Sequence, residues 1–431
     1  MEKEPTVAET WLRPIKLWIV STPSRAFSSI FLLGVSLRVV LLPFLPLDPA
    51  WQLRQENGAT AENLVRTGAY ANPYALPTGP TAHPVPFYTA VIALSYRVFG
   101  VTRSAELARC CLAAVSFSTL YALLPWIAVR LGVGAPAGII GGLAGALGPL
   151  HLQMGIFYGG LGEEFAGLTM ALLLVVSLAR WTSQACSVRG SVLIGLAWGA
   201  AFHIAPPLLL VMLSCLAFEV WWKRDRLRLL HPCIILLGAT LACVPWALRN
   251  HTVFGEFIFI RSNFGLELRM GNHEGASAAM EMMDRREPGL HPRTHRAEAE
   301  KVRALGEVEY MRQARLEALQ WIGRKPGTFL RLTASRVGHF WFGSLHTPII
   351  AMGTSLLTTL AILGARRVYP VLSIPQRAAL LLPLATFPLI YYVVAYMPRY
   401  RVPVDWILLM LAGVEVYHWI GRAAPQNRSA S

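Results

Sequence analysis

Four acidic residues stand where apolar segments of the sequence end, and acids at such boundaries can do chemistry on a bound substrate. Asp48 and Glu56 follow the first apolar segment, in a stretch rich in Gly, Pro and Tyr, and Glu163 and Glu164 follow a later one. A carboxylate within hydrogen-bond reach of a hydroxyl can take its proton during group transfer. These four are the candidates for catalysis. The alternative without a catalytic role is an acid exposed to solvent in a loop, or an acid that stabilises the start of a helix.

Arginines lie near other segment ends and could complete a phosphate site. Arg249, Arg399 and Arg401 are of this kind, and a guanidinium offers a planar fork to phosphate oxygens. The same side chains could instead simply reach from the membrane to its interface. Weaker candidates for substrate contact are three residues that turns, caps or a structural His explain equally well, namely Asn250, Asn272 and His83.

The spacing of His and Cys predicts no metal centre. His83, His151 and His203 stand singly, and the six Cys lie almost entirely inside apolar runs, without the spacing of metal ligands. We therefore expect neither a metal, nor another cofactor, nor a disulfide.

Composition defines the class of protein. Of the 431 residues, 54% are hydrophobic and only 15% are charged, whereas soluble domains carry about 25% charged residues. The chain is therefore predicted to be an all-α polytopic membrane protein with the lipid bilayer as a partner. A net charge of +15 could indicate nucleic-acid binding, but Lys and Arg are scattered at the ends of apolar runs, as the positive-inside rule requires. Nucleic acid is therefore not an expected partner.

Apolar runs long enough to cross about 30 Å of hydrocarbon predict about ten transmembrane helices. Residues 85–99 are too short to cross and contain Arg97, so we expect a juxtamembrane or re-entrant helix there. Residues 298–322 have the pattern of one amphipathic helix, and residues 335–343 look interfacial. The expected spans are 27–47, 105–129, 137–158, 165–181, two short spans between 191 and 222 divided at Pro206-Pro207, 234–248, 347–363, 377–396 and 402–420.

This topology divides the chain into five regions. Residues 1–26 form a cytoplasmic segment, and residues 27–248 form a transmembrane module with a first outer loop at 48–100. Residues 249–343 form a larger extracytoplasmic loop after the seventh span, with interfacial helices. Residues 344–421 hold the last spans, and residues 422–431 form a cytoplasmic tail. The candidate acids and arginines then all meet on the outer face, while the spans are nearly free of charge.

Several short motifs, in order along residues 27–415, resemble bacterial GT-C glycosyltransferases, the relatives of the protein O-mannosyltransferases and of the aminoarabinose transferase of lipid A (glycosyltransferase family 39-like). The motifs are Glu56-Asn57-Gly58, Ala61-Glu62-Asn63-Leu64, Gly68-Ala69-Tyr70, Asn72-Pro73-Tyr74, Gly79-Pro80-Thr81-Ala82, Pro86-Phe87-Tyr88, Phe99-Gly100, Pro245-Trp246-Ala247-Leu248-Arg249-Asn250, Phe254-Gly255, the run from Arg261 to Asn272, and Tyr400-Arg401-Val402-Pro403-Val404-Asp405.

The resemblance implies an inverting transfer of a sugar from a polyprenyl-phosphate donor to a hydroxyl of a lipid, glycan or protein acceptor. It also implies a bacterial inner membrane, with the active site facing the periplasm or cell exterior. The family's first-loop base matches Glu56, where many relatives have Asp, and Asp48 is the rival. The second acidic position of the family matches Glu164, with Glu163 beside it.

Two other functions fit the same sequence. One is a transporter or flippase of a lipid-linked solute, although transporters usually place ionisable residues at mid-membrane and show inverted repeats, and no repeat is found here. The other is a catalytically inactive GT-C-like assembly protein.

Overall fold

A computed structural model describes residues 22–44, 47–148, 161–183, 186–223, 229–280 and 290–423. Over these ranges the chain is helical, and its β structure is limited to two isolated bridges, Ala71 with Pro80 and Ala279 with Tyr396. The prediction of an all-α protein is therefore confirmed for this part of the chain.

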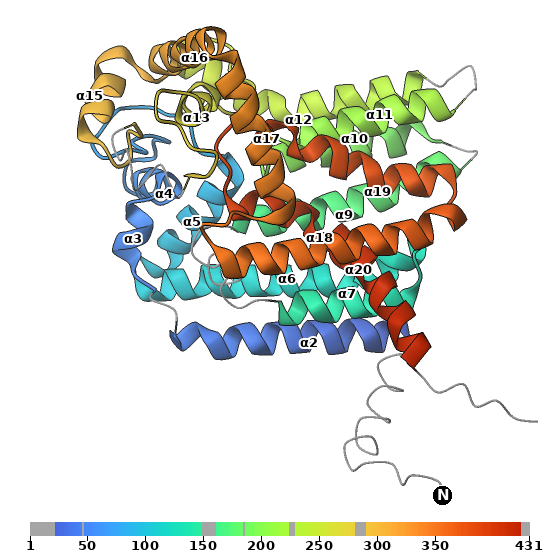
Figure 1. The fold of residues 1–431 in the computed structure, drawn as a ribbon. Helices are drawn as coiled ribbons and strands as arrows, with labels where there is room; N and C mark the ends of the chain where they lie inside the picture. Colours follow the sequence, from blue (N-terminus) through green and yellow to red (C-terminus); the bar gives the residue numbers. More distant parts are fainter. Residues whose placement is uncertain are drawn as a thin grey trace, which may run out of the picture.

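Long helices lie side by side and form one bundle (Figure 1). The N-terminal end of α2 and the C-terminal end of α20 lie at the same end of this bundle, as expected for two termini on one side of a membrane. The helices of the bundle are α2 (Pro23–Leu41), α6 (Arg103–Arg130), α7 (Ala135–Leu147), α9 (Leu161–Thr182), α10 (Val188–Phe202), α11 (Leu208–Trp222), α12 (Leu230–Phe254), α18 (Pro348–Val368), α19 (Ile374–Thr386) and α20 (Val402–Ala423).

Six of these helices, α2, α6, α9, α12, α18 and α20, are long and apolar enough to cross a membrane, and α7, α10 and α11 are shorter apolar helices. A helix occupies each of the ten predicted spans, and the break between α10 and α11 falls at Pro206-Pro207. The protein thus has the character of a polytopic membrane protein. Ten crossings remain a prediction.

Close helix approach holds the bundle together. A Cβ atom at Gly364 on α18 would lie 1.9 Å from the carbonyl oxygen of Leu411 on α20, so only glycine fits there. Small residues at such crossings let backbones approach closely, which favours helix association in lipid.

Shorter helices gather at the end of the bundle opposite the termini and form a cap (Figure 1). Its α4 packs on α5, and α13 packs on α16. The cap helices are α3 (Pro49–Leu53), α4 (Glu56–Thr67), α5 (Pro86–Phe99), α13 (Phe264–Gly271), α15 (Arg296–Leu305), α16 (Glu307–Arg324) and α17 (Pro326–Phe342); the short 3-10 turns are η1 (Leu42–Phe44), η2 (Tyr369–Val371), η3 (Phe387–Tyr392) and η4 (Pro398–Arg401).

Three predicted elements differ from the structure. The single helix expected at 298–322 is two helices, because Gly306 adopts φ +81° between α15 and α16. The span expected at 377–396 ends at Thr386, and a 3-10 turn that contains Pro388 follows. Helix α12 continues to Phe254, so Arg249 and Asn250 lie inside its last turns and not beyond its end. Residues 149–158 of the third expected span lie outside the described residues.

Candidate functional site

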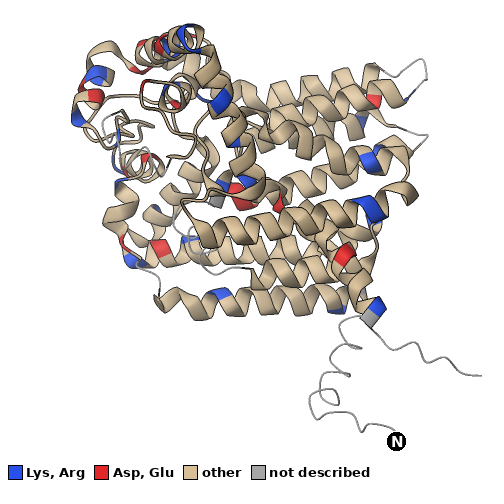
Figure 2. Cartoon of the chain, in the orientation of Figure 1, with Lys and Arg blue, Asp and Glu red and all other residues tan. Residues whose placement is uncertain are grey.

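Charged residues concentrate on the cap and at the two ends of the bundle, and a group of both signs lies where cap and bundle meet (Figure 2). At this junction the first turn of α9 carries Glu163, and η4 carries Arg399. Glu163 Oε1 lies 3.5 Å from Arg399 Nε, and the Arg399 side chain remains 43% exposed. Arg399 also lies over Tyr400, whose ring stacks on Tyr391 with 4.3 Å between centroids.

Glu56 is the first residue of α4, in the first outer loop. Its Oε1 lies 3.2 Å from Arg293 Nε and 3.5 Å from His291 Nε2. Burial acts to raise the pKa of Glu56, but His291, His83 and Arg293 outweigh it and lower that pKa to about 2. Glu56 is therefore ionised at neutral pH. The charge of Glu56 also acts on Arg399, but the contact that the structure shows among these predicted residues is the one between Glu163 and Arg399.

The other two candidate acids have different surroundings. Glu164 is completely buried, and neither of its carboxylate oxygens has a hydrogen-bond partner among the described residues. Among the described residues, the polar contacts of Asp48 are local: it accepts a hydrogen bond from the backbone N–H of Ala50 at 2.9 Å as the N-cap of α3, and lies 3.7 Å from Arg54 Nη2. Asp48 therefore has a structural role that needs no substrate.

Hydrogen bonds from Arg249 hold the first outer loop against α12. Its guanidinium donates to the carbonyl oxygens of Thr81 at 2.7 Å and Tyr70 at 2.9 Å, and to Asn250 Oδ1 at 3.0 Å. The buried Asn250 in turn donates to Ile258 O. Both side chains are thus engaged with the protein, in positions where the sequence predicted contact with substrate.

Asn272 and His83 are likewise engaged within the cap. Asn272 donates to Leu268 O and Val393 O and accepts from the buried Arg336. His83 Nδ1 forms a hydrogen bond with the hydroxyl of Tyr74 at 2.9 Å.

Arg401 lies deeper in the bundle than Arg399. Its Nε donates to Asp405 Oδ1 at 2.6 Å and its Nη1 to Trp341 O at 3.1 Å, while Nη2 has no partner among the described residues. A cavity of about 110 Å³ adjoins it, between α6, α7, α18 and α20. The lining of this cavity is largely apolar and includes Phe117, Tyr121, Leu357, Tyr396 and Leu409.

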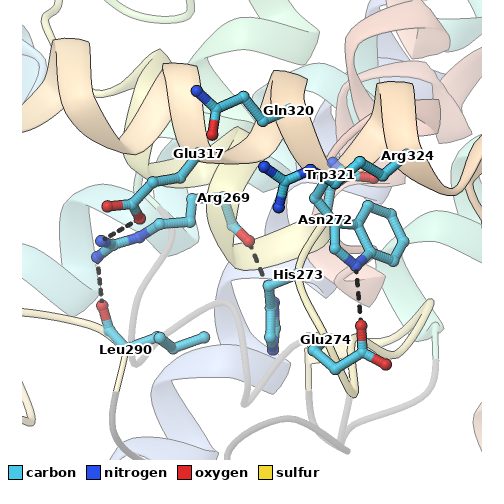
Figure 3. A pocket seen from close by; sticks show the side chains of 9 residues that line it. All are labelled: Arg269, Asn272, His273, Glu274, Leu290, Glu317, Gln320, Trp321 and Arg324. Carbon is cyan, nitrogen blue, oxygen red and sulfur yellow. Dashed lines mark hydrogen bonds and ion pairs between the residues drawn. The ribbon is translucent and has the colours of Figure 1, made fainter.

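A second cavity, of about 290 Å³, opens on the cap between α13 and α16. Figure 3 shows Gln320, Trp321 and Arg324 on one side of it and Arg269 and His273 on the other. Most of the residues that line it are polar or charged.

Glu56, His83 and His291 are the described residues whose placement could hold a metal ion, since one ligand atom from each lies within 4.8 Å of the others. Sequence reasoning missed His291 and Arg293 at this place. Three separate segments contribute the group, so no local spacing could have revealed it.

Solved structures of archaeal oligosaccharyltransferases have a similar fold. The oligosaccharyltransferase of Archaeoglobus fulgidus in the apo form matches with a TM-score of 0.55 and 16% identity over 94% of this chain. The same organism's oligosaccharyltransferase AglB in complex with an inhibitory peptide and a dolichol-phosphate matches with a TM-score of 0.53 and 15% identity over 92%. This chain has the oligosaccharyltransferase fold.

The match spans about half of the oligosaccharyltransferase, 51% of the apo chain and 50% of the AglB chain. The resemblance to membrane glycosyltransferases is therefore supported at the level of fold, through an oligosaccharyltransferase, and the O-mannosyltransferase or family 39 subtype stays a prediction. No protein-family model matches the sequence, and a search of the curated proteins finds no significant match.

Proposed function

We propose that this protein is an integral-membrane glycosyltransferase that moves a sugar, with inversion, from a polyprenyl-phosphate donor to an acceptor hydroxyl on the outer face of the bacterial inner membrane. The observation that carries the proposal is the pair of Glu163 and the half-exposed Arg399, on which the charge of Glu56 also acts. The oligosaccharyltransferase fold supports it, although a fold alone does not define an activity.

Glu56 is the proposed base. It is ionised at neutral pH, so it can accept the proton of an acceptor hydroxyl as the hydroxyl oxygen attacks the anomeric carbon. The bond from that carbon to the phosphate oxygen breaks, and the lipid phosphate leaves with its negative charge. Arg399 is the proposed partner of that phosphate, because its side chain is the more exposed of the two candidate arginines at this junction and a guanidinium stabilises developing negative charge. Glu163 orients Arg399, and the buried Glu164 is the next residue of the same helix.

The apolar cavity beside Arg401 supports a lipid-linked donor. Aromatic and aliphatic walls next to an unpartnered guanidinium nitrogen suit the first isoprene unit of a lipid whose phosphate lies nearby. The oligosaccharyltransferase whose fold is shared binds a dolichol-phosphate, and we propose the same class of ligand here. The acceptor is a lipid, a glycan or a protein.

Transport is the second candidate, and the position of the buried charges argues against it. The buried ion pairs Arg109–Glu106 and Arg180–Glu219 show that the spans hold more charge than the sequence predicted. These residues lie toward helix ends and not at mid-bundle, whereas transporters place their ion sites near the membrane midplane.

The test compares Glu56→Gln, Asp48→Asn and a matched control, Glu62→Gln, which changes a partly exposed acid of the same helix. Each variant is assayed for sugar transfer in membranes supplied with the lipid-linked sugars of the host. We expect Glu56→Gln to lose at least about 100-fold in rate, as removal of a general base does, and the control to retain activity. Full activity in Glu56→Gln together with loss in Asp48→Asn would make Asp48 the base. Absence of transfer by the wild-type protein from every donor would overturn the function.

A further inference from the structure

The cavity between α13 and α16, which we call the cap pocket, has a polar lining that the proposed sugar transfer does not use. Its volume of about 290 Å³ is close to the lower end of the range for small-molecule sites, about 300–1,000 Å³. Such sites are usually lined by apolar side chains, but seven of the nine residues that line this one are polar or charged, and the exceptions are Leu290 and Trp321 (Figure 3). The lining therefore fits a polar ligand.

The formal charges of the cap pocket cancel. Its lining contains two arginines, Arg269 and Arg324, and two glutamates, Glu274 and Glu317. Glu317 lies 3.1 Å from Arg269 Nη1, and Glu274 lies 2.6 Å from the Nζ atom of Lys325. A phosphate would be repelled by the glutamates, and a cation by the arginines. A neutral ligand with several hydroxyls fits such a lining, because each hydroxyl both donates and accepts hydrogen bonds.

One wall of the pocket is held rigidly by the protein. Nη2 of the buried Arg269 donates to Glu298 Oε2 at 2.7 Å and to the hydroxyl of Tyr310 at 2.6 Å. Nδ2 of the buried Asn272 donates to the carbonyl oxygens of Leu268 and Val393, each at 2.8 Å. A ligand that binds between such side chains does not have to order them first, so less free energy is lost on binding.

The opposite wall, on α16, offers polar groups beside an aromatic ring. Among the described residues, the side chains of Gln320 and Arg324 have no hydrogen-bond partner (Figure 3). Trp321 Nε1 donates to Glu274 Oε2 at 3.3 Å, which fixes the indole at the edge of the pocket. The C–H groups of a sugar ring pack on the negative face of an indole, while its hydroxyls bond to planar amide and guanidinium groups. This combination favours a saccharide.

The cap pocket adjoins the segment that leads to Arg399. Asn272 is bonded to Val393, and a Cβ atom at Gly271 would lie 2.9 Å from the backbone nitrogen of Ala395. The chain continues from Ala395 into η4, which carries Arg399. A saccharide in this pocket is therefore held on the cap, beside the segment that supplies the proposed phosphate-binding arginine.

We propose that the cap pocket binds a neutral saccharide. Resting on the proposed sugar transfer, we further propose that this saccharide is part of the acceptor, so that the acceptor is a carbohydrate, free or attached to a lipid, and not a protein.

The experiment measures saccharide binding by calorimetry. The full-length protein is purified in a detergent without a sugar head group and titrated with cellobiose, maltose and N,N′-diacetylchitobiose. The wild type should bind at least one of these disaccharides. Gln320→Ala should weaken that binding by about 3- to 10-fold, because one or two hydrogen bonds are lost. Trp321→Leu should weaken it by about 10-fold or more, because the aromatic surface is removed.

Matched controls change the same residue types outside the pocket. Gln313→Ala replaces an exposed Gln of the same helix, and Trp221→Leu replaces an exposed indole on α11. Both should bind the disaccharide as the wild type does. Gln320→Ala should also keep the melting temperature of the wild type in the absence of sugar, which shows that weaker binding does not come from unfolding.

Two results would overturn the saccharide site. One is a wild type that binds none of the three disaccharides, and binding of trialanine in their place would identify a peptide site. The other is equal disaccharide affinity in the wild type, Gln320→Ala and Trp321→Leu.

The acceptor role has its own readout, sugar transfer at low acceptor concentration. The rate in Gln320→Ala should fall by the same factor as the disaccharide affinity, and the bound disaccharide should compete with the acceptor. An unchanged KM for the acceptor in this variant would overturn the acceptor role. Absence of transfer by the wild type would overturn the proposed function and the acceptor role with it, whereas the binding measurement needs no transfer. The pocket and the enzyme can therefore fail separately.

Discussion

Arg399 is the cation best placed to meet a phosphate. Its side chain is 43% exposed, whereas Arg401 is 3% and Arg336 is 0% exposed and both donate to carbonyl groups. Arg249 also donates its hydrogen bonds to carbonyl oxygens of the protein. At the scale of single residues, a guanidinium that can bind substrate is one whose donors the protein has not already used.

Replacing Arg399 by Lys should therefore impair transfer although the charge is kept. Lys is a point charge that cannot form the paired, planar contact of a guanidinium. We expect the rate at low donor concentration to fall by about 10- to 100-fold, the equivalent of about 1.4–2.8 kcal/mol. The matched control is Arg377→Lys, since Arg377 lies on α19, away from the cap. Unchanged kinetics in Arg399→Lys would contradict phosphate binding by this residue.

Part of the candidate site could be predicted from residue types and segment ends alone. Glu56, Glu163 and Arg399 were proposed in this way, because the predicted topology places the loops that carry them on one face, and their roles stay predictions. The roles of Arg249 and Asn272 could not be found. An Arg at a helix end has the same sequence signature whether it meets phosphate or a carbonyl group 168 residues away.

At the scale of elements, α16 begins with the residue that holds the first loop in place. The buried Glu307 accepts hydrogen bonds from the hydroxyls of Thr81 and Ser262 and from the backbone N–H of Ala82. Most helix boundaries were predictable to within a few residues, except at the end of α12, at the end of α19 and where Gly306 divides one expected helix. The amphipathic pattern of residues 298–322 continues through that break, so the pattern alone could not show it.

Glu307→Ala should loosen the first loop. It leaves three buried donors without their acceptor, and we expect the folded protein to lose roughly 2–4 kcal/mol, seen as a lower melting temperature in detergent. The matched control is Glu309→Ala, because Glu309 lies on the same turn but is exposed and pairs with Arg312.

The stabilising effect of Glu307 should also depend on pH. Burial raises the pKa of Glu307 despite the hydrogen bonds from Thr81, Ser262 and Ala82. The folded protein then holds this proton at pH values where the unfolded chain has lost it, so this contribution to stability is fully present below about pH 4.5 and is lost as pH rises through the folded-state pKa. The wild type should gain stability relative to Glu307→Gln between pH 8 and pH 5. A constant difference in melting temperature would contradict this.

At the scale of the whole molecule, the bundle and its cap have opposite characters. Six helices are long and apolar enough to span a membrane, while charged side chains gather on the cap and at the ends of the bundle (Figure 2). Composition and run length predicted this division, because spanning segments must be about 20 apolar residues long. The packing of the cap on the bundle was not predictable, since it depends on contacts between distant segments.

The ten predicted crossings can be tested by cysteine labelling in a variant without native Cys. Ala69→Cys, at an exposed position of the first loop, and Gly327→Cys, in open space at the start of α17, should react with a membrane-impermeant maleimide from the outside of intact cells. Arg189→Cys, near the start of α10, should react only after the cells are opened. Reaction of all three positions from the same side would contradict the topology.

The hydrogen bonds that join Arg249 and Glu307 to the first outer loop also determine the order in which these parts of the protein can assemble. Thr81 is bonded to Glu307, 226 residues further along the chain. At 5–20 residues per second a ribosome needs about 10–45 s to make that length. The acids of the first loop are therefore synthesised long before the side chains that hold this loop in place. A chain interrupted after α12 would carry Glu56 and Glu163 without Arg399, so the proposed site can form only after η4 has been synthesised.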